Sequence, residues 1–500
     1  MKLLYIDLFC GAGGTSTGVN LARVNGQECA RVIACVNHDA KAIASHASNH
    51  PDAMHFTEDI RTLELTPLIE HLKRCRTMNP DAIVVLWASL ECTNFSKAKG
   101  GQPRDADSRT LAEHLFRYIE AINPDFIQIE NVEEFMSWGD VDANGKPISM
   151  DKGKAYCRWV RNVKKYGYNF EHRILNAADF GAYTSRKRFF GIFAKDGLPI
   201  TFPEATHAKK PESNLFGSLK RWKPVKDVLD FSDEGRSIFY REKPLSEKTL
   251  ERIFAGLVKF VAGGKDKFIV KYNSMNQAGK YQAPSVDEPC PVVATQNRLA
   301  IAQVSFMSKQ FSGHPESKNC SIDEPAGTIT CVDHHAFVTA FYGNGNNHSI
   351  EAPAPTLTTK EKFAVVNSVF FDMQYGNGTS ASVETAAGAL TANPKHKLIT
   401  VKFPLDAPCY AIPIMPDDSP MTIKIKDFMA LYGIIDIKMR MLKISELKLI
   451  MGFPEDYILV GNQTEQKKFI GNAVEVNMAR VLCESLYKSL TPMFATKVAI

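Results

Sequence analysis

The sequence lacks the long apolar run that a membrane-spanning helix needs. No stretch of eighteen consecutive apolar residues occurs, and the apolar run that begins at Leu3 meets Asp7 too early to form the core of a signal peptide. We therefore expect neither a membrane span nor secretion, and we expect a cytoplasmic protein.

Paired cysteines are also missing. The 11 cysteines are spread singly from Cys10 to Cys483, without a C-x-x-C pair. Disulfide frameworks and zinc sites both depend on cysteines at characteristic spacings. The spacing therefore predicts reduced thiols and no metal site. We interpret His38 and His50 as surface residues without a catalytic or metal-binding role.

Charge of one sign is not in large excess. The chain has 60 Lys and Arg residues against 55 Asp and Glu residues, a formal net charge of +5 at pH 7. This balance permits a polyanionic partner without requiring one. With 500 residues, of which 44% are hydrophobic, the chain is long enough for two domains.

Short apolar runs alternate with longer amphipathic stretches in the first two hundred residues. The clearest predicted strands are 3–8, 31–36, 82–87, 126–129 and 189–193, and helical spacing occurs at 15–24, 40–50 and 110–122. This alternation is typical of parallel strands joined by helical crossovers. It predicts an α/β fold with a doubly wound, Rossmann-like sheet that carries helices on both faces.

The composition changes after a polar stretch at 206–220. Residues 272–421 are rich in Gly, Asn, Thr and β-branched side chains, and short imperfect copies of one pattern begin at Pro289, Pro325, Pro353 and Ala386, with a fainter copy at Pro420. An array of β units would present polar loops to an extended ligand, and an irregular β domain is the alternative.

The chain regains its first character after about residue 437. A helix is expected at 444–451, a turn at 452–454, and a final helix after 471–474. We expect a first domain at 1–205, a β-rich insertion at 206–436, and a segment at 437–500 that returns to the first domain.

Glycines follow the first predicted strand. Asp7 and Phe9 lead into Gly11, Gly13 and Gly14, where a helix is expected to begin. Glycines at such a turn let a ligand approach the backbone and the helix N-terminus. Tight packing of the turn is the alternative reason for them.

Polar side chains follow the next strands. Asn37 ends the second predicted strand, and Asp59 and Ile60 follow a further short segment. In an open α/β sheet, the ribose and the base of a nucleoside lie at such strand ends.

A cysteine stands in a polar loop after the strand at 82–87. Glu91 directly precedes Cys92, Ser96 lies four positions after it, and a basic, glycine-rich stretch follows. An exposed loop cysteine can act as a nucleophile, although a single loop cysteine is often inert.

Two further strands carry charged groups at an end. Glu130 directly follows the strand at 126–129, which we expect beside the strand that precedes Cys92. A carboxyl group in a pocket can stay protonated and donate to a ring nitrogen. Arg186 and Arg188 precede the strand at 189–193, two positions apart in an extended segment. A solvated surface cluster is the alternative for the arginines.

Taken in order, these motifs resemble those of the DNA (cytosine-5) methyltransferases. Residues 7–14 are similar to the cofactor loop of that family, 92–96 to its nucleophile loop, 130–132 to its Glu-Asn-Val, 186–188 to its arginine segment, and 471–474 to its closing Gly-Asn-Ala-Val. The resemblance covers the first two hundred residues and about the last sixty.

The resemblance implies S-adenosyl-L-methionine as the cofactor and a set of residues that bind it. That set is Asp7, Phe9, Gly11, Gly13, Gly14, Asn37, Asp59, Ile60, Glu91, Leu111, Asn472 and Val474. It also implies that Cys92 adds to carbon 6 of cytosine, that Glu130 holds ring nitrogen 3 and the exocyclic amine, and that Arg188, with Arg186 nearby, holds the base carbonyl and Glu130.

The resemblance further implies a double-stranded DNA substrate with a flipped-out cytosine. Ser96, Lys97, Lys99 and Arg104 would contact the DNA, and the insertion would be the target-recognition domain. Its candidate base-reading residues are Gln296, Arg298, His334, His335 and Asn344. We expect a monomer without a metal ion.

Four positions depart from the pattern of the family. Glu91 replaces its Pro, Thr93 its Gln, Asn37 its ribose-binding Glu, and Thr184 the Gln of its arginine segment. A carboxylate at Glu91 would raise the pKa of the neighbouring thiol. The acidic residue resembles a trait of phage-type and prophage-type orphan bacterial enzymes, which indicates a bacterial enzyme of that branch.

Two alternatives stay open. The same chemistry on RNA is disfavoured by the long insertion. A degenerate DNA-binding scaffold is disfavoured because Cys92, Glu130 and Arg188 are all present, although Glu91 keeps this alternative open.

Overall fold

The computed structural model describes most of the chain outside two long parts, the segment after the strand 83–89 and much of the insertion. The described residues are 2–90, 112–138, 153–211, 213–214, 217–230, 232–233, 235–258, 267–272, 293–295, 300–303, 369–373, 378–382, 389–392, 396–400, 412–432, 434 and 436–495. Within these ranges no helix is long and apolar enough to cross a lipid bilayer.

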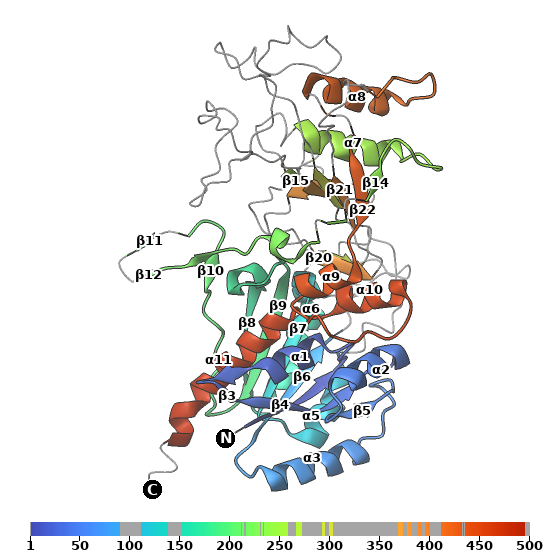
Figure 1. The fold of residues 1–500 in the computed structure, drawn as a ribbon. Helices are drawn as coiled ribbons and strands as arrows, with labels where there is room; N and C mark the ends of the chain where they lie inside the picture. The colour runs from blue at the N-terminus through green and yellow to red at the C-terminus, as the bar shows by residue number, and fades with distance from the viewer. Residues whose placement is uncertain are drawn as a thin grey trace.

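A seven-stranded sheet organises the first part of the chain (Figure 1). Its strands, in spatial order, are β5 (Met54–Phe56), β4 (Ala30–Val36), β1 (Leu3–Leu8), β6 (Ile83–Ser89), β7 (Phe126–Asn131), β9 (Lys187–Lys195) and β8 (Tyr168–Asn176). The first five run parallel, with the order reversing direction beside β1, as the doubly wound prediction requires. The predicted α/β Rossmann-like fold is confirmed.

The direction of β9 differs from the parallel pattern expected for this part of the chain. β9 pairs antiparallel with both β7 and β8. The connection from β8 to β9 is short and contains only the 3-10 helix η3 (Ala177–Phe180). A connection of this length joins antiparallel strands, because parallel strands need a longer crossover.

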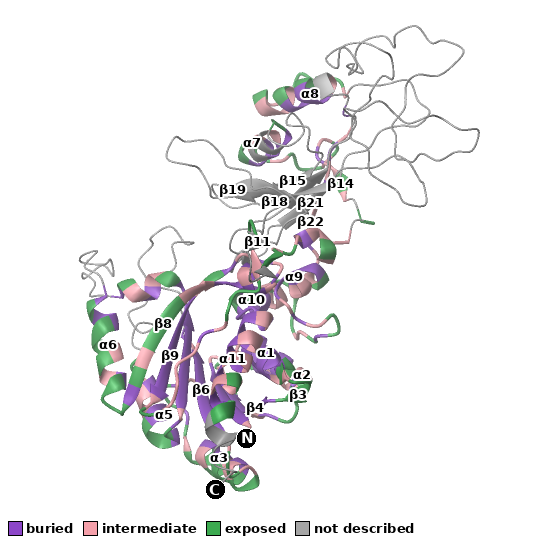
Figure 2. Cartoon of the chain, turned by 90° about the vertical axis from the view of Figure 1, so that its left-hand side faces the viewer, coloured by how far each residue is buried: buried purple, intermediate pink, exposed green. Residues whose placement is uncertain are grey.

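Helices cover both faces of this sheet. Successive side chains of β1 point to opposite faces and pack against different helices. Leu4, Ile6 and Leu8 pack with α3 (Thr66–Met78), α5 (Leu115–Ile122) and α6 (Lys154–Lys164). Leu3 and Tyr5 point to the opposite face, where α1 (Gly14–Leu21) and α11 (Val476–Ala495) lie. Figure 2 shows the strands of this sheet buried between the helices.

The C-terminal segment ends in a helix that packs on the first sheet. After α9 (Ile444–Ile450) and α10 (Gln463–Asn472), α11 crosses α1 so closely that Gly18 has no room for a side chain. A Cβ atom there would overlap the carbonyl oxygen of Val476 and lie 2.7 Å from Ala479 Cβ.

Gly18→Ala should therefore lower the free energy of unfolding by about 1–3 kcal/mol, although alanine is the better helix former. Urea unfolding followed by circular dichroism measures the change. Ser48→Ala, at an exposed position of α2 (Ala40–Asn49), is the control and should change the value by less than about 0.5 kcal/mol. Equal stability of Gly18→Ala and the unmodified chain would contradict this packing.

The insertion contains a second sheet of seven strands. Its order is β14 (Arg236–Ser237), β22 (Lys438–Met441), β21 (His396–Thr400), β17 (Ala300–Gln303), β15 (Lys267–Tyr272), β18 (Val369–Met373) and β19 (Gly378–Ser382). A separate parallel pair joins β16 (Val293–Thr295) and β20 (Ala389–Ala392). The sheet runs past residue 436 to Met441, and most of the predicted repeats fall outside the described residues.

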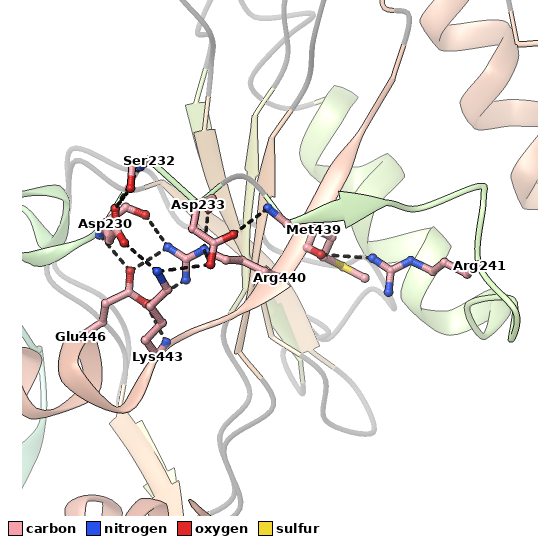
Figure 3. A network of polar contacts seen from close by, with 9 residues as sticks. Asp230, Ser232, Asp233, Arg241, Met439, Arg440, Lys443 and Glu446 are labelled. Atoms are coloured by element: carbon pink, nitrogen blue, oxygen red, sulfur yellow. Dashed lines mark hydrogen bonds and ion pairs between the residues drawn. The ribbon is translucent and has the colours of Figure 1, made fainter.

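Ion pairs tie the chain together where it enters and leaves the insertion (Figure 3). Arg440, at the end of β22, binds both carboxylate oxygens of Glu446 on α9, at 2.8 and 3.0 Å, and donates to the backbone carbonyls of Asp230 and Asp233. Lys443 reaches the Asp230 carboxylate at 2.6 Å. Arg440 and Glu446 are nearly buried, so this network fixes the base of the insertion on α9.

Candidate active site

The turn between β1 and α1 is tight. Phe9, Gly11 and Gly13 all adopt positive φ angles, of 60°, 52° and 101°. A Cβ atom on Gly11 would meet no atom of the described residues within 4 Å, so this glycine faces open space in that part of the chain. The glycine turn therefore offers exposed backbone to a ligand at the end of β1.

Gly13 and Gly14 serve close packing. A Cβ atom on Gly13 would overlap the hydroxyl group of Tyr457, and one on Gly14 would overlap the carbonyl oxygen of Val474. The sequence left ligand approach and tight packing open for this turn, and the structure indicates packing at these two positions. Gly14 thereby brings the closing segment, with Val474, against the glycine turn.

Asp7 is fully buried below this turn. Its Oδ2 accepts a hydrogen bond from Ser16 at 2.7 Å, and its Oδ1 accepts none within the described part of the chain. Burial raises the pKa of Asp7 to about 8, although the Ser16 hydrogen bond opposes the shift. Asp7 therefore lies behind the turn, where it orders the start of α1.

Polar groups at the next strand ends lie where the sequence predicted them. Asn37, after β4, accepts through Oδ1 from the backbone N–H of Asp39 at 2.9 Å, and its amide N–H groups have no partner among the described residues. The carboxylate of Asp59 binds Arg61, whose guanidinium holds the pKa of Asp59 below its ordinary value. The carbonyl of Ile60 accepts from Tyr118 at 2.9 Å.

Glu130 and Arg188 form an ion pair at the end of β7. Arg188 Nε lies 3.2 Å from Glu130 Oε1, and both side chains are largely buried. Glu130 is in register with Ser89, the last residue of β6, and the Asn131 side chain donates to the carbonyl of Leu90 at 3.3 Å. The structure thus brings the predicted carboxylate to the point where the chain continues toward Cys92.

Arg186 has a different partner. Its guanidinium donates through Nη1 to the carbonyl of Gly471 at 3.2 Å, and the side chain is buried. It therefore supports the closing segment, in which Asn472 is exposed and Val474 is buried. Of the two arginines, the contacts of Arg188 alone include Glu130.

Several predicted site residues fall outside the described residues. They are Glu91, Cys92, Ser96, Lys97, Lys99, Arg104 and Leu111, and in the insertion Gln296, Arg298, His334, His335 and Asn344.

The prediction that His50 is a surface residue was wrong. His50 is buried, and its Nε2 lies 3.1 Å from Thr17 Oγ1 and 3.3 Å from the hydroxyl group of Tyr457. The Tyr457 hydroxyl also donates to the carbonyl of Ala12 at 2.6 Å. No sequence pattern signals the contacts of Tyr457, because more than four hundred residues separate it from Ala12 and His50.

Glu475 is a buried carboxyl group that the sequence analysis did not single out. Its two oxygens accept from the backbone N–H groups of Asn477 and Met478 at the start of α11, at 3.1 and 2.8 Å. Burial raises the pKa of Glu475 to about 7 despite these hydrogen bonds.

The raised pKa makes stability depend on pH. The unfolded chain loses this proton near the ordinary pKa of 4.5, whereas the native chain keeps it until about pH 7. In this pH window, the contribution of Glu475 to the free energy of unfolding therefore falls as pH rises. The free energy of unfolding of the unmodified chain should fall by about 3 kcal/mol across this window because of Glu475. Glu475→Gln stays neutral, so this part of the fall should be absent in the variant. Urea unfolding at pH 5 and 7.5 tests this against Glu455→Gln, an exposed control. Parallel pH profiles of Glu475→Gln and the unmodified chain would refute it.

Comparisons with known proteins identify the family of this chain. The family described as C-5 cytosine-specific DNA methylase matches residues 3–488. Type II methyltransferase M1.HphI of Haemophilus parahaemolyticus is 30% identical over 211 residues, which cover 42% of this chain and 50% of that protein. Type II methyltransferase M.AquIA of Picosynechococcus is 28% identical over 233 residues, 46% of this chain and 88% of that protein.

The alignment spans about half the length of the first of these relatives. Among solved structures, one described as a prophage-encoded DNA modification methyltransferase from E. coli is 16% identical, covers 98% of this chain and 100% of its own, and has a TM-score of 0.45. The family match extends over nearly the whole sequence. It includes the first seven-stranded sheet, the glycine turn after β1, and β7 with Glu130. The chain belongs to the C-5 cytosine-specific DNA methylase family.

Proposed function

We propose that this chain transfers a methyl group from S-adenosylmethionine to carbon 5 of cytosine within a specific sequence of double-stranded DNA. The observation that carries the proposal is the buried ion pair of Glu130 and Arg188. It stands at the ends of β7 and β9, beside the end of β6, from which the chain continues to Cys92. A carboxylate fixed by a guanidinium, at the point from which the chain leads on to a cysteine, suits a covalent reaction on a pyrimidine ring.

The residues around the glycine turn fit a nucleoside cofactor. Within the described part of the chain, Gly11 leaves open space above the backbone, and the amide N–H groups of Asn37 can donate to a ribose hydroxyl. Arg61 holds the side chain of Asp59, and Tyr118 holds the backbone carbonyl of Ile60. These two residues would border the base. When bound there, S-adenosylmethionine supplies an electrophilic methyl group.

The side chains of the protein prepare the cytosine. The Cys92 thiolate forms a bond with ring carbon 6, which gives carbon 5 the electron density that a nucleophile needs. Glu130 holds ring nitrogen 3 and the exocyclic amine, while Arg188 holds Glu130 and the base carbonyl. After carbon 5 loses its proton, elimination releases the Cys92 sulfur.

The DNA side of the proposal rests on the basic segment after Cys92 and on the insertion. The target base must leave the duplex, because carbon 6 is stacked between its neighbours, at a cost of a few kcal/mol. Ser96, Lys97, Lys99 and Arg104 would contact the phosphates near the flipped nucleotide. The insertion, from about residue 206 to 436, would read the target sequence.

Methyl transfer from tritium-labelled S-adenosylmethionine to duplex DNA tests this function, with RNA assayed in parallel and bisulfite sequencing of the product. We expect label on DNA, at carbon 5 of cytosine in one short sequence context. Label on RNA alone would replace the DNA proposal. Absence of label on both, with measurable cofactor binding, would support a scaffold without catalytic activity.

A further inference from the structure

Two thiols and two imidazoles meet behind the glycine turn, although their spacing in the sequence predicted no metal site. The ligand atoms of Cys10, Cys35 and His46 lie within 4.8 Å of one another. His55 lies beside this group of three, with its Nε2 3.0 Å from His46 Nδ1, and is the nearest candidate for a fourth ligand among the described residues. None of the four residues belongs to the proposed reaction.

Four separate elements bring this cluster together. Cys10 lies in the glycine turn, Cys35 on β4, His46 on α2 and His55 on β5. Cys35 and His55 are register partners on adjacent parallel strands, so their side chains point to the same face of the sheet. The three residues other than His55 are buried, and His55 is half-buried at the edge strand.

The hydrogen bonds around His46 direct a lone pair toward the cluster. Ser16 Oγ donates its proton to Asp7, so it accepts from His46 Nε2–H at 2.8 Å. Neutral His46 then carries its lone pair on Nδ1, which faces Cys35 Sγ at 3.6 Å and His55 Nε2 at 3.0 Å. Metal-binding histidines are oriented in this way, by a second hydrogen bond from the ring nitrogen that does not bind the metal.

Two distances around His46 suit neighbouring ligands of a tetrahedral zinc ion. Bonds of about 2.3 Å to sulfur and about 2.0–2.1 Å to nitrogen place neighbouring ligand atoms roughly 3.3–3.8 Å apart. The measured sulfur–nitrogen distance of 3.6 Å falls in this range, and the nitrogen–nitrogen distance of 3.0 Å needs only a small expansion. Two thiolates and two imidazoles are a ligand set that Zn²⁺ prefers.

We propose that Cys10, Cys35, His46 and His55 form a structural Zn²⁺ site that fastens the glycine turn to β4, β5 and α2. With four protein ligands and no open position, the ion would hold these elements in place and would not take part in the reaction. Because the cluster is buried, the ion would enter during folding.

The test measures zinc in the full-length chain, expressed in zinc-supplemented cells and purified without chelator. We expect about one zinc ion per chain, and at least tenfold less in Cys35→Ser. His55→Gln, at the sheet edge, gives a second variant that should fold and bind more weakly. Circular dichroism confirms that each variant is folded.

Cys75→Ser is the matched control. Cys75 Sγ also lies 3.6 Å from a histidine nitrogen, that of His71. No second thiol of the described residues joins this pair, so the variant should keep the zinc. Refolding with Co²⁺ should give a thiolate-to-cobalt charge-transfer band in the unmodified chain and in Cys75→Ser, but not in Cys35→Ser. A chain without zinc and without this band would overturn the proposal, as would a Cys10–Cys35 disulfide found by mass spectrometry or full zinc content in Cys35→Ser.

Discussion

Glu130→Gln is expected to lower the turnover number for methyl transfer by a factor on the order of 10²–10⁴. The amide can still fill the space of the carboxyl group, but it carries no charge and cannot form an ion pair with the Arg188 guanidinium, 3.2 Å away. It also cannot hold the ring nitrogen and the exocyclic amine of cytosine as the carboxyl group does. Cofactor affinity should change little, because Glu130 lies two strands away from β1 and its glycine turn. Single-turnover transfer of tritium, with cofactor binding by calorimetry, separates the two effects.

Glu133→Gln provides the control for this prediction. Glu133 lies three positions further along, in the 3-10 helix η2 (Glu133–Ser137), and is exposed, so its variant should keep the turnover of the unmodified chain. Arg188→Lys should fall between the two, because an ammonium group keeps the charge but loses the planar donor geometry. If Glu130→Gln turned over as fast as Glu133→Gln, the role assigned to Glu130 would be wrong.

The sequence predicted the first sheet well because its strands are buried on both faces. The run at 3–8 matches β1 residue for residue, since continuous apolar runs bounded by glycines and polar residues mark such strands. The direction of β9 could not be predicted in this way, because apolar patterning is the same in both directions. β8 escaped notice because its middle residues are exposed, and its pattern lacks a continuous apolar run.

The order of motifs predicted the Glu130 strand and its arginine segment, but the contacts of each arginine needed the structure. Arg186 and Arg188 are two positions apart, yet one binds the closing segment and the other binds Glu130. The Cys10, Cys35 and His46 cluster was also beyond the sequence. Its members are 25 and 11 positions apart, and only the pairing of β1 with β4 and the placement of α2 bring them together.

The largest effect is expected from Cys92, whose role is inferred from the sequence alone. Cys92→Ala should reduce methyl transfer by at least about 10⁴-fold, because without the sulfur bond to carbon 6 the cytosine ring is a poor nucleophile at carbon 5. Cofactor binding should persist, since the glycine turn and the ends of β4 and β5 do not depend on this thiol. Tritium transfer to duplex DNA measures the loss.

A second readout tests the covalent bond itself. A duplex that carries 5-fluorocytosine at the target position cannot lose a proton from carbon 5, so the unmodified chain should remain attached to it under denaturing conditions, whereas Cys92→Ala should not. Cys157→Ala is the matched control, because Cys157 is a free and exposed cysteine on α6, and its variant should keep both transfer and attachment. Full activity of Cys92→Ala would exclude the covalent mechanism. Loss of activity in Cys92→Ala with the covalent complex intact would place the attacking thiol elsewhere in the chain.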